Sequence, residues 1–206
     1  MPPGGGKGMS TLALNIRMHG KRAVIIGGGA VALRKLRTLL AAGASVRVVA
    51  VHSCPDIVDM ENSGVIDIKH GHYDASDLDG AFLAIAATDD FKVNQQVCAD
   101  ARTRSILVSV ADNPGAGDCT FPALLQQGDL EIAVSTGGRC PTFAVDVRNY
   151  IAKHIGHEYG VILDQLSVER EKLLTNGSSS TYNTRVLRSR AVDLLAELTE
   201  RKDMLP

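Results

Sequence analysis

The feature that most constrains this chain is a run of three glycines between an apolar segment and a segment with helical periodicity. Residues 23–26 are all apolar, Gly27-Gly28-Gly29 follow, and apolar residues then recur at helical spacing from Val31 to Ala42. After Gly43 comes a second β-branched segment, Ser45 to Val51. This order predicts a strand, a tight turn, a helix closed by Gly43 and a parallel strand, which together form one βαβ unit.

Strand and helix signals keep alternating after this unit. Apolar runs of strand length are separated by segments with helical spacing or turn residues. The expected elements are a short helix at 55–62, strands at 65–69 and 82–87, a helix at 93–103 and a strand at 106–111. The sequence therefore predicts an α/β fold with a doubly wound parallel sheet of the Rossmann type.

The pattern changes after Asn113, where a Pro- and Gly-rich break begins. A strand is expected at Leu130 to Ser135, and a helix with Pro141 near its start follows the Thr-Gly-Gly turn. From Arg148 onward the chain is mainly helical. The expected division is a flexible tail at 1–8, a Rossmann domain at 9–113, a small α+β segment at 114–147 and a helical domain at 148–206.

Charge and hydropathy narrow the classes of partner. The formal net charge of -1 gives no basic field for a nucleic-acid backbone. No run reaches the ~18 consecutive apolar residues of a membrane helix, and the first residues are not those of a secretory signal. The four cysteines form no C-x-x-C pair, which favours reduced, packed thiols over a zinc cage. We expect a cytoplasmic protein that binds neither nucleic acid nor a membrane.

The glycine turn fits the pattern G-x-G-x-x-A, with Gly27, Gly29 and Ala32 at the three small positions. In that pattern the first glycine allows the tight turn, and the second lets the backbone approach a pyrophosphate. The third small residue lets the helix pack on the sheet. The helix N-terminus adds free N–H groups and a positive dipole end. A dinucleotide site is the prediction, with a purely structural turn as the alternative.

The second strand ends at Val51-His52 without the acidic residue that usually holds a ribose 2′-hydroxyl. His52 and Ser53 could meet a ribose through neutral hydrogen bonds, or a 2′-phosphate if His52 is charged. They could equally be ordinary loop residues. These residues alone leave the choice between NAD and NADP open.

Four stretches together resemble one family, the precorrin-2 dehydrogenases, which include the N-terminal part of siroheme synthase and a fungal dehydrogenase/ferrochelatase. The resemblance covers roughly residues 14 to 150. Its motifs are GGGAVALRK from Gly27, AATDDFKVNQQV from Ala86, SVAD and TFPA from Ser109 and Thr120, and AVSTGGRCP from Ala133. The chain departs from the family in the glycine-rich loop 113–119 and after about residue 155.

The resemblance implies an enzyme that uses NAD⁺ to oxidise precorrin-2 to sirohydrochlorin in siroheme biosynthesis. It implies that some members also insert Fe²⁺ as a substrate, and that the chain forms a homodimer through segment 114–147. Its implied cofactor contacts lie at the glycine turn and at the ends of two further strands. They are Gly27, Gly28, Gly29, Ala30, Val31, Val51, His52 and Thr88.

Asp112 follows a predicted strand and matches the aspartate that the family uses in dehydrogenation. A carboxylate at this place can accept the proton lost when a reduced macrocycle is oxidised. It can also take protons from pyrrole nitrogens as a metal enters. An aspartate before Asn-Pro-Gly is also typical of a simple turn. The resemblance favours the catalytic role.

The expected substrate side is the stretch Ser135, Thr136, Gly137, Gly138 and Arg139. Backbone N–H groups before a helix, with a nearby cation, suit the carboxylates of a tetrapyrrole, and precorrin-2 carries eight of them. Ser135 matches a serine that is phosphorylated in some relatives, but capping the turn through its hydroxyl is the favoured role.

Two other functions remain open from the residues alone. One is a non-catalytic NAD-sensing module, which would need the glycine turn but not Asp112. The other is a dehydrogenase of another small substrate, with Tyr150, Lys153 or Tyr159 as its acid or base. His70 with His72 and His154 with His157 have metal-like spacing but lack a third ligand nearby, so no metal site is expected. Asp90 is expected to cap the following helix.

Overall fold

The computed structural model describes residues 11–175 and 180–203. The chain divides into two compact units, and the boundary in the sequence falls between Phe121 and Pro122. Each unit is described by itself. The expected tail at 1–8 lies outside the described residues.

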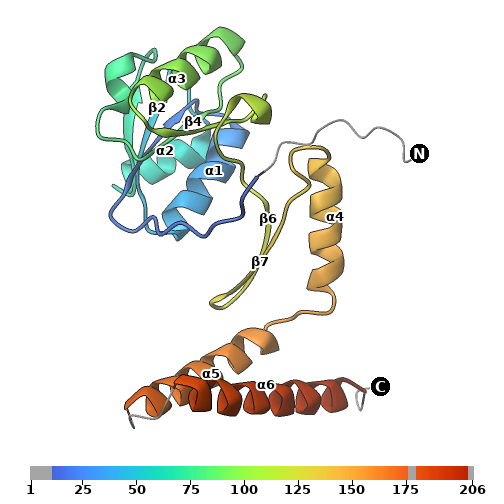
Figure 1. Cartoon of the computed structure of the whole chain (residues 1–206). Helices are drawn as coiled ribbons and strands as arrows, with labels where there is room; N and C mark the ends of the chain where they lie inside the picture. The colour runs from blue at the N-terminus through green and yellow to red at the C-terminus, as the bar shows by residue number, and fades with distance from the viewer. Residues whose placement is uncertain (1–10, 176–179, 204–206) are drawn as a thin grey trace, which may run out of the picture. The chain divides into compact units, whose positions relative to one another are not determined.

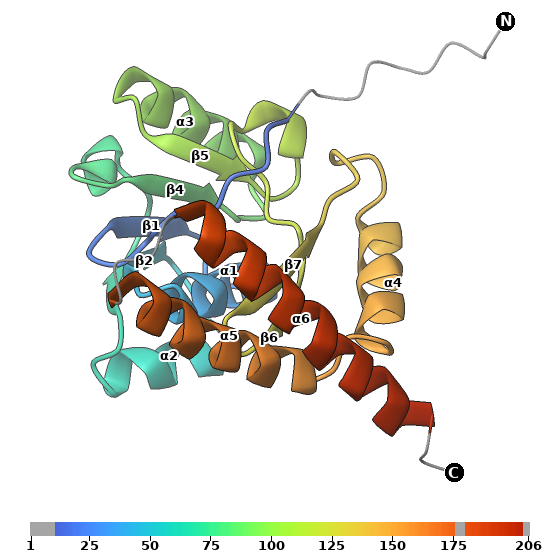
Figure 2. The ribbon, with the colours of Figure 1, turned by 60° about the horizontal axis from the view of Figure 1, so that its bottom comes forward.

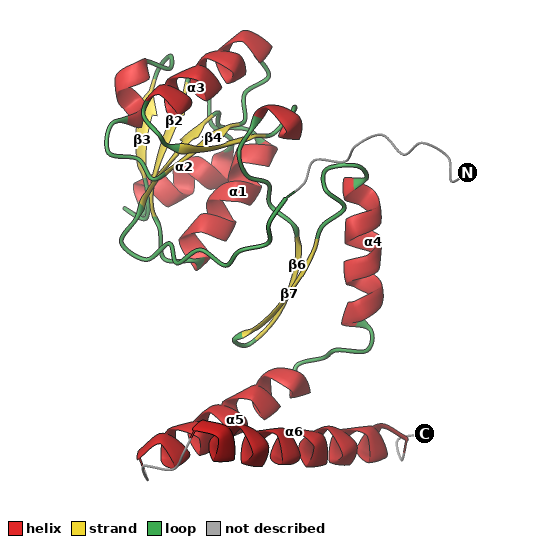
Figure 3. Ribbon diagram, viewed as in Figure 1, coloured by secondary structure: helices red, strands yellow, loops and turns green. Residues whose placement is uncertain are grey.

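The first unit is built on one parallel sheet with helices around it (Figures 1 and 3). The five strands of this sheet have the order β3-β2-β1-β4-β5. The sheet confirms the predicted Rossmann-type fold. Its order reverses between β1 and β4, because the chain crosses back over the sheet after β3. The strands are β1 Arg22–Ile26, β2 Ser45–Ala50, β3 Asp67–His70, β4 Leu83–Ala86 and β5 Leu107–Val110.

Helices cover both faces of this sheet, as its continuous apolar strands require. One core packs α1 (Ala30–Ala41) and α2 (Pro55–Asn62) on the face that carries Ala23 and Ile25. A second core packs α3 (Phe91–Thr103) and the short 3₁₀ helix η1 (Ala75–Leu78) on the opposite face. Successive residues of β1 thus enter different cores, which is the period-2 alternation of a strand buried on both sides.

Local signals set the ends of these helices. The side chain of Asp90 accepts hydrogen bonds from the backbone N–H groups of Lys92 (2.8 Å) and Val93 (3.3 Å), which confirms the predicted N-cap of α3. Gly43 has φ +76°, and its N–H donates to the carbonyl of Leu40 at 2.9 Å just after α1 ends. A positive φ at this place is the helix-closing role predicted for Gly43.

The first unit extends to Phe121, whereas the Rossmann domain was predicted from the sequence to end at residue 113. After the 3₁₀ helix η2 (Pro114–Ala116) the chain runs back along the outer edge of β5. The N–H of Asp118 donates to the carbonyl of Val108 at 2.7 Å, and the carboxylate of Asp118 accepts from the N–H of Val108 at 3.2 Å. These bonds hold residues 114–121 to the sheet, so the boundary moves to Phe121–Pro122.

The second unit contains an antiparallel hairpin and three helices (Figure 2). Strands β6 (Ala123–Gln127) and β7 (Leu130–Val134) pair through a turn at Gly128, and α4 (Pro141–Ala152) packs against both strands. Helix α5 (Glu158–Thr175) contacts the hairpin and packs along α6 (Ser180–Asp203). Strand β7 and helix α4 agree with the elements predicted from the sequence, whereas β6 was not predicted.

None of the helices described in residues 11–175 and 180–203 combines the length and apolar character needed to cross a lipid bilayer.

Candidate functional site

The glycine turn lies at the carboxyl edge of the parallel sheet, where β1 and β4 are neighbours. The N–H of Ala87, just after β4, donates to the carbonyl of Ile26 at 2.8 Å, and the N–H of Gly27 donates to Val49 at 2.9 Å. Ligands of open parallel sheets bind at the point where the strand order reverses. That point in this sheet is the junction of Gly27 and Ala87.

Gly27 and Gly28 are required by their surroundings in the protein itself. Gly27 has φ +120°, and a Cβ added there would overlap the carbonyl oxygen of Ala87. A Cβ on Gly28 would overlap the carbonyl of His52 and come within 2.7 Å of Ser53 Oγ. The N–H of Cys54 also donates to the carbonyl of Gly28 at 2.8 Å. These two glycines let the turn pack between the ends of β2 and β4.

Gly29 differs from its two neighbours because it faces open space. It is exposed, has an ordinary φ of −88°, and a Cβ added there meets no atom within 4 Å. Ala30 and Val31 beside it are also exposed and open α1 with unpaired backbone N–H groups. Such a helix start suits a phosphate. No other residue in the described part of the chain fills the space beside Gly29.

The end of β2 carries the third part of the predicted cofactor site. Val51 and His52 are exposed, whereas the hydroxyl of Ser53 is buried and has no hydrogen-bond partner among the described residues. A buried hydroxyl without a partner costs free energy, which a ligand hydroxyl at this edge could offset. The open turn at Gly29 and the unsatisfied Ser53 together fit a dinucleotide. From the sequence, Ser53 was considered both as a contact to the ribose and as an ordinary loop residue, and its burial was not foreseen.

Thr88 is fixed by a buried residue that the sequence analysis did not single out. Asn94 on α3 is 1% exposed, and its Oδ1 accepts from the N–H (3.2 Å) and the hydroxyl (2.8 Å) of Thr88. Its Nδ2 donates to the carbonyl of Thr88 at 3.0 Å. Asn94 therefore holds all the backbone polar groups of Thr88, and it does so directly beside the glycine turn.

We expect Asn94→Leu to weaken cofactor binding as well as stability. The change leaves the N–H and carbonyl of Thr88 without partners, so the free energy of unfolding should fall by about 2–4 kcal/mol. Dinucleotide affinity should fall about tenfold because the Thr88 loop moves against Gly27. Urea unfolding and titration calorimetry measure the two effects, with Gln96→Ala on the exposed face of α3 as control. Unchanged affinity in a destabilised Asn94→Leu protein would reduce Asn94 to a structural role.

Asp112 lies in the turn after β5 and is exposed. It lines a pocket of about 210 Å³ between α3 and the loop that follows β5. The N–H of Ala111 donates to the carbonyl of Ala86 at 2.9 Å, so this turn is tied to the end of β4 and thus to Thr88. The pocket residues are Phe91, Asn94, Gln95, Cys98, Ala99, Arg102, Val110, Asp112, Asn113 and Ala116.

The stretch expected to hold substrate lies in the second unit, apart in sequence from Asp112 and the glycine turn of the first. The N–H of Gly137 donates to Ser135 Oγ at 3.2 Å, which is the turn-capping role that the sequence analysis favoured for Ser135. Thr136 Oγ1 accepts from the N–H of Cys140 at 3.2 Å. The loop thus uses several of its own N–H groups, and the exposed side chain of Arg139 is its cation.

The two histidine pairs considered as metal ligands have other surroundings. His70 lies 3.1 Å from both carboxylate oxygens of Glu61, and His154 Nδ1 lies 3.0 Å from the carbonyl of Tyr150. Within the described part of the chain, no three His, Cys, Asp or Glu side chains gather as a metal site would require.

Comparison with known proteins gives the following similarities. Residues 14–123 match a family model described as putative NAD(P)-binding. The siroheme synthase of Chromobacterium violaceum is 41% identical over 152 residues, which cover 74% of this chain and 32% of that protein. The siroheme synthase of Pseudomonas entomophila is 39% identical over 165 residues, or 80% of this chain and 36% of that protein. The chain therefore spans about a third of the length of these curated relatives.

A solved structure named SirC, precorrin-2 dehydrogenase, is similar with a TM-score of 0.75 and 22% sequence identity. The similarity covers 92% of this chain and 100% of that one. At this identity the comparison shows the fold, and it extends through both units.

Proposed function

The chain belongs to the putative NAD(P)-binding family and is a relative of the siroheme synthases, and from this membership we propose that it catalyses the NAD-dependent oxidation of precorrin-2 to sirohydrochlorin. The four motifs that resemble the precorrin-2 dehydrogenases support this proposal. The rival functions, a non-catalytic sensing module and a dehydrogenase of another small substrate, gain no support from the relatives.

The observation that carries the proposal is the order of three functional loops along one sheet edge. The glycine turn follows β1, Thr88 follows β4 and Asp112 follows β5, and these three strands are adjacent. Neighbouring strands are about 4.8 Å apart, so the ends of β1 and β5, which the glycine turn and Asp112 follow, lie roughly 10 Å apart along this edge. That spacing suits a carboxylate acting on a substrate that lies against the nicotinamide end of a bound dinucleotide.

Each group of this chain has a defined task in the proposed reaction. The N–H groups that open α1, with Gly29, bind the pyrophosphate, and Ser53 with His52 meets the adenosine ribose. NAD⁺, when bound, supplies the acceptor for the hydride equivalent that leaves the macrocycle. Asp112 accepts the proton that is released, and Asn94 holds the Thr88 loop in place.

The proposal also includes the substrate side and the assembly. Arg139 and the Ser135–Gly138 turn would receive carboxylates of the macrocycle, and two copies of the chain would associate through the second unit. Supporting the association, Phe143 and Tyr150 on α4 are 58% and 65% exposed, large values for aromatic side chains. A cytoplasmic location fits the redox chemistry and the four free cysteines.

The direct test is anaerobic turnover of precorrin-2 with NAD⁺ by the purified chain. We expect NADH and sirohydrochlorin to appear together in equal amounts, as their absorbances record. NADP⁺ in the same assay measures cofactor preference, and Fe²⁺ added to the product tests whether the chain also inserts the metal as a substrate. A protein that binds NAD⁺ but forms no NADH would contradict the proposal and favour the sensing module.

A further inference from the structure

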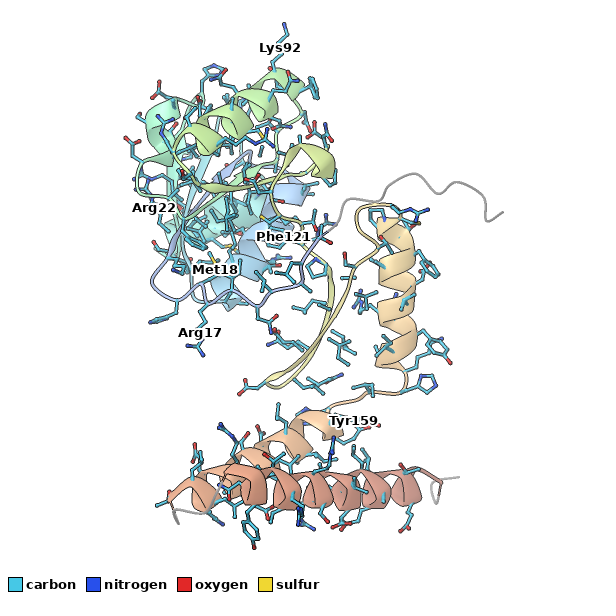
Figure 4. The ribbon with its side chains drawn as sticks, in the orientation of Figure 1. Arg17, Met18, Arg22, Lys92, Phe121 and Tyr159 are labelled. Carbon is cyan, nitrogen blue, oxygen red and sulfur yellow. The ribbon has the colours of Figure 1, made fainter. Side chains whose placement is uncertain are left out.

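Lys35 is a charged residue of α1 to which the proposed reaction gives no task. Its Nζ lies over the ring of Phe121, 4.0 Å from the ring centroid. The two residues come from GGGAVALRK and TFPA, two motifs that are far apart in the sequence. Figure 4 shows Phe121 beside α1. The two motifs thus meet in one cation–π contact.

Lys35 lies on the flank of α1 that faces away from the adenosine end of the site. Arg37, about 200° further round the helix, pairs with Asp56 of α2 at 2.5 Å. Because α2 follows β2, the Arg37 flank is the side of the adenosine ribose. Lys35 instead follows Val31 by one turn, on the flank where Phe121 returns after β5.

The surroundings of Lys35 leave its charge uncompensated. In the part of the chain that the structure describes, no carboxylate lies within ion-pair distance of its ammonium. Burial and the neighbouring charge of Arg34 lower the pKa of Lys35 to about 8, and a smaller effect of Cys119 opposes them. A half-buried cation without a counter-ion is unfavourable in the folded chain, and an anionic ligand would relieve it.

We infer that Lys35 binds a carboxylate side chain of the substrate, next to the cofactor helix and on the nicotinamide side. The inference rests on the proposed function, since precorrin-2 is the polycarboxylate that would reach this flank. Phe121 holds the lysine side chain against α1, so less rotamer entropy is lost when the carboxylate binds. Lys35 would thereby help to set which edge of the macrocycle meets the cofactor.

The first test compares Lys35→Met with Lys35→Arg. Methionine keeps the packing on Phe121 and removes the charge, so the KM for precorrin-2 should rise about tenfold. The kcat and the Kd for NAD⁺ should stay within about twofold, and arginine should restore most of the affinity. Arg37→Met, on the opposite flank of the same helix, is the matched control. If Lys35→Met gives the KM of wild type, Lys35 only packs against Phe121 and the inference is wrong.

The second test uses pH, since the ammonium is present below pH about 8 and lost above it. The KM of wild type should therefore rise between pH 7 and 9, whereas that of Lys35→Arg should stay flat. The charged and titratable groups around Lys35 are Arg34 on the same helix and Cys119, itself beside Asp118. Cys119→Ser removes the titrating thiol and should keep the rise. An equal rise in Lys35→Arg would overturn the inference.

The two hypotheses can fail separately. A wild type that turns over precorrin-2 and a Lys35→Met variant with normal KM would overturn the inference alone. A wild type that forms no NADH would overturn the proposed function. Direct absorbance titration with sirohydrochlorin then decides on Lys35: weaker binding by Lys35→Met supports its role, and equal or absent binding by both proteins contradicts it.

Discussion

Asp112→Asn should lower the kcat for precorrin-2 by about 10²- to 10⁴-fold, the range expected when a proton acceptor is removed. Asparagine has the same shape and is as well suited as aspartate to a turn before Pro114. The fold and the Kd for NAD⁺ should therefore stay unchanged. Anaerobic NADH formation at saturating substrate measures the effect, and titration calorimetry measures NAD⁺ binding.

The conservative replacement separates the two roles considered for this residue. If Asp112 served only the turn, the asparagine variant would keep its turnover. Asp129→Asn, in the turn between β6 and β7, removes an exposed carboxylate from the second unit and should leave kcat unchanged. An active Asp112→Asn protein would move the search for the proton acceptor to other groups of the pocket.

The glycines of the turn should separate folding from cofactor binding. In Gly27→Ala the new Cβ overlaps the carbonyl of Ala87 at a positive φ, so we expect a loss of more than about 3 kcal/mol in the free energy of unfolding. In Gly29→Ala the Cβ meets open space and the protein should fold normally. The methyl group would then occupy the place of the pyrophosphate and reduce NAD⁺ affinity by about a hundredfold.

Thermal unfolding and calorimetry of the two variants give the comparison directly. The expected pattern is an unstable Gly27→Ala protein and a stable Gly29→Ala protein that binds NAD⁺ about a hundredfold more weakly than wild type. Normal NAD⁺ binding by Gly29→Ala would show that the turn is structural, which is the alternative that the sequence left open.

The first unit was predictable because its pattern is local. Each buried parallel strand is a short continuous apolar run, and helix signals such as Asp90 and Gly43 lie within a few residues of the ends they determine. Strand β6 was missed because Ala-Leu-Leu-Gln-Gln has no strand propensity of its own. Its conformation comes from pairing with β7, a tertiary effect that overrides local preference.

The contacts of the residues that support the site could not be found in this way. Asn94 sits in a helix that reads as amphipathic, and only the fold brings its amide to Thr88. Ser53 differs from other loop serines in being buried without a partner, which no sequence pattern reveals. Lys35 and Phe121 are far apart in the sequence, and only the folded domain brings them into contact. A polar residue at a helix position that should be apolar, as at Asn94, is the one available signal.

The segment after Asp112 also covers part of the outer edge of strand β5. A strand at the edge of a sheet exposes unpaired N–H and carbonyl groups that invite pairing with another chain. Asp118 occupies both groups of Val108 on the outer edge of β5, through its own N–H and its carboxylate. A deletion in the loop 113–119 would therefore leave the backbone groups of Val108 unpaired at the edge of the sheet. The loop must therefore be long enough to place Asp118 against Val108, and this requirement is independent of catalysis.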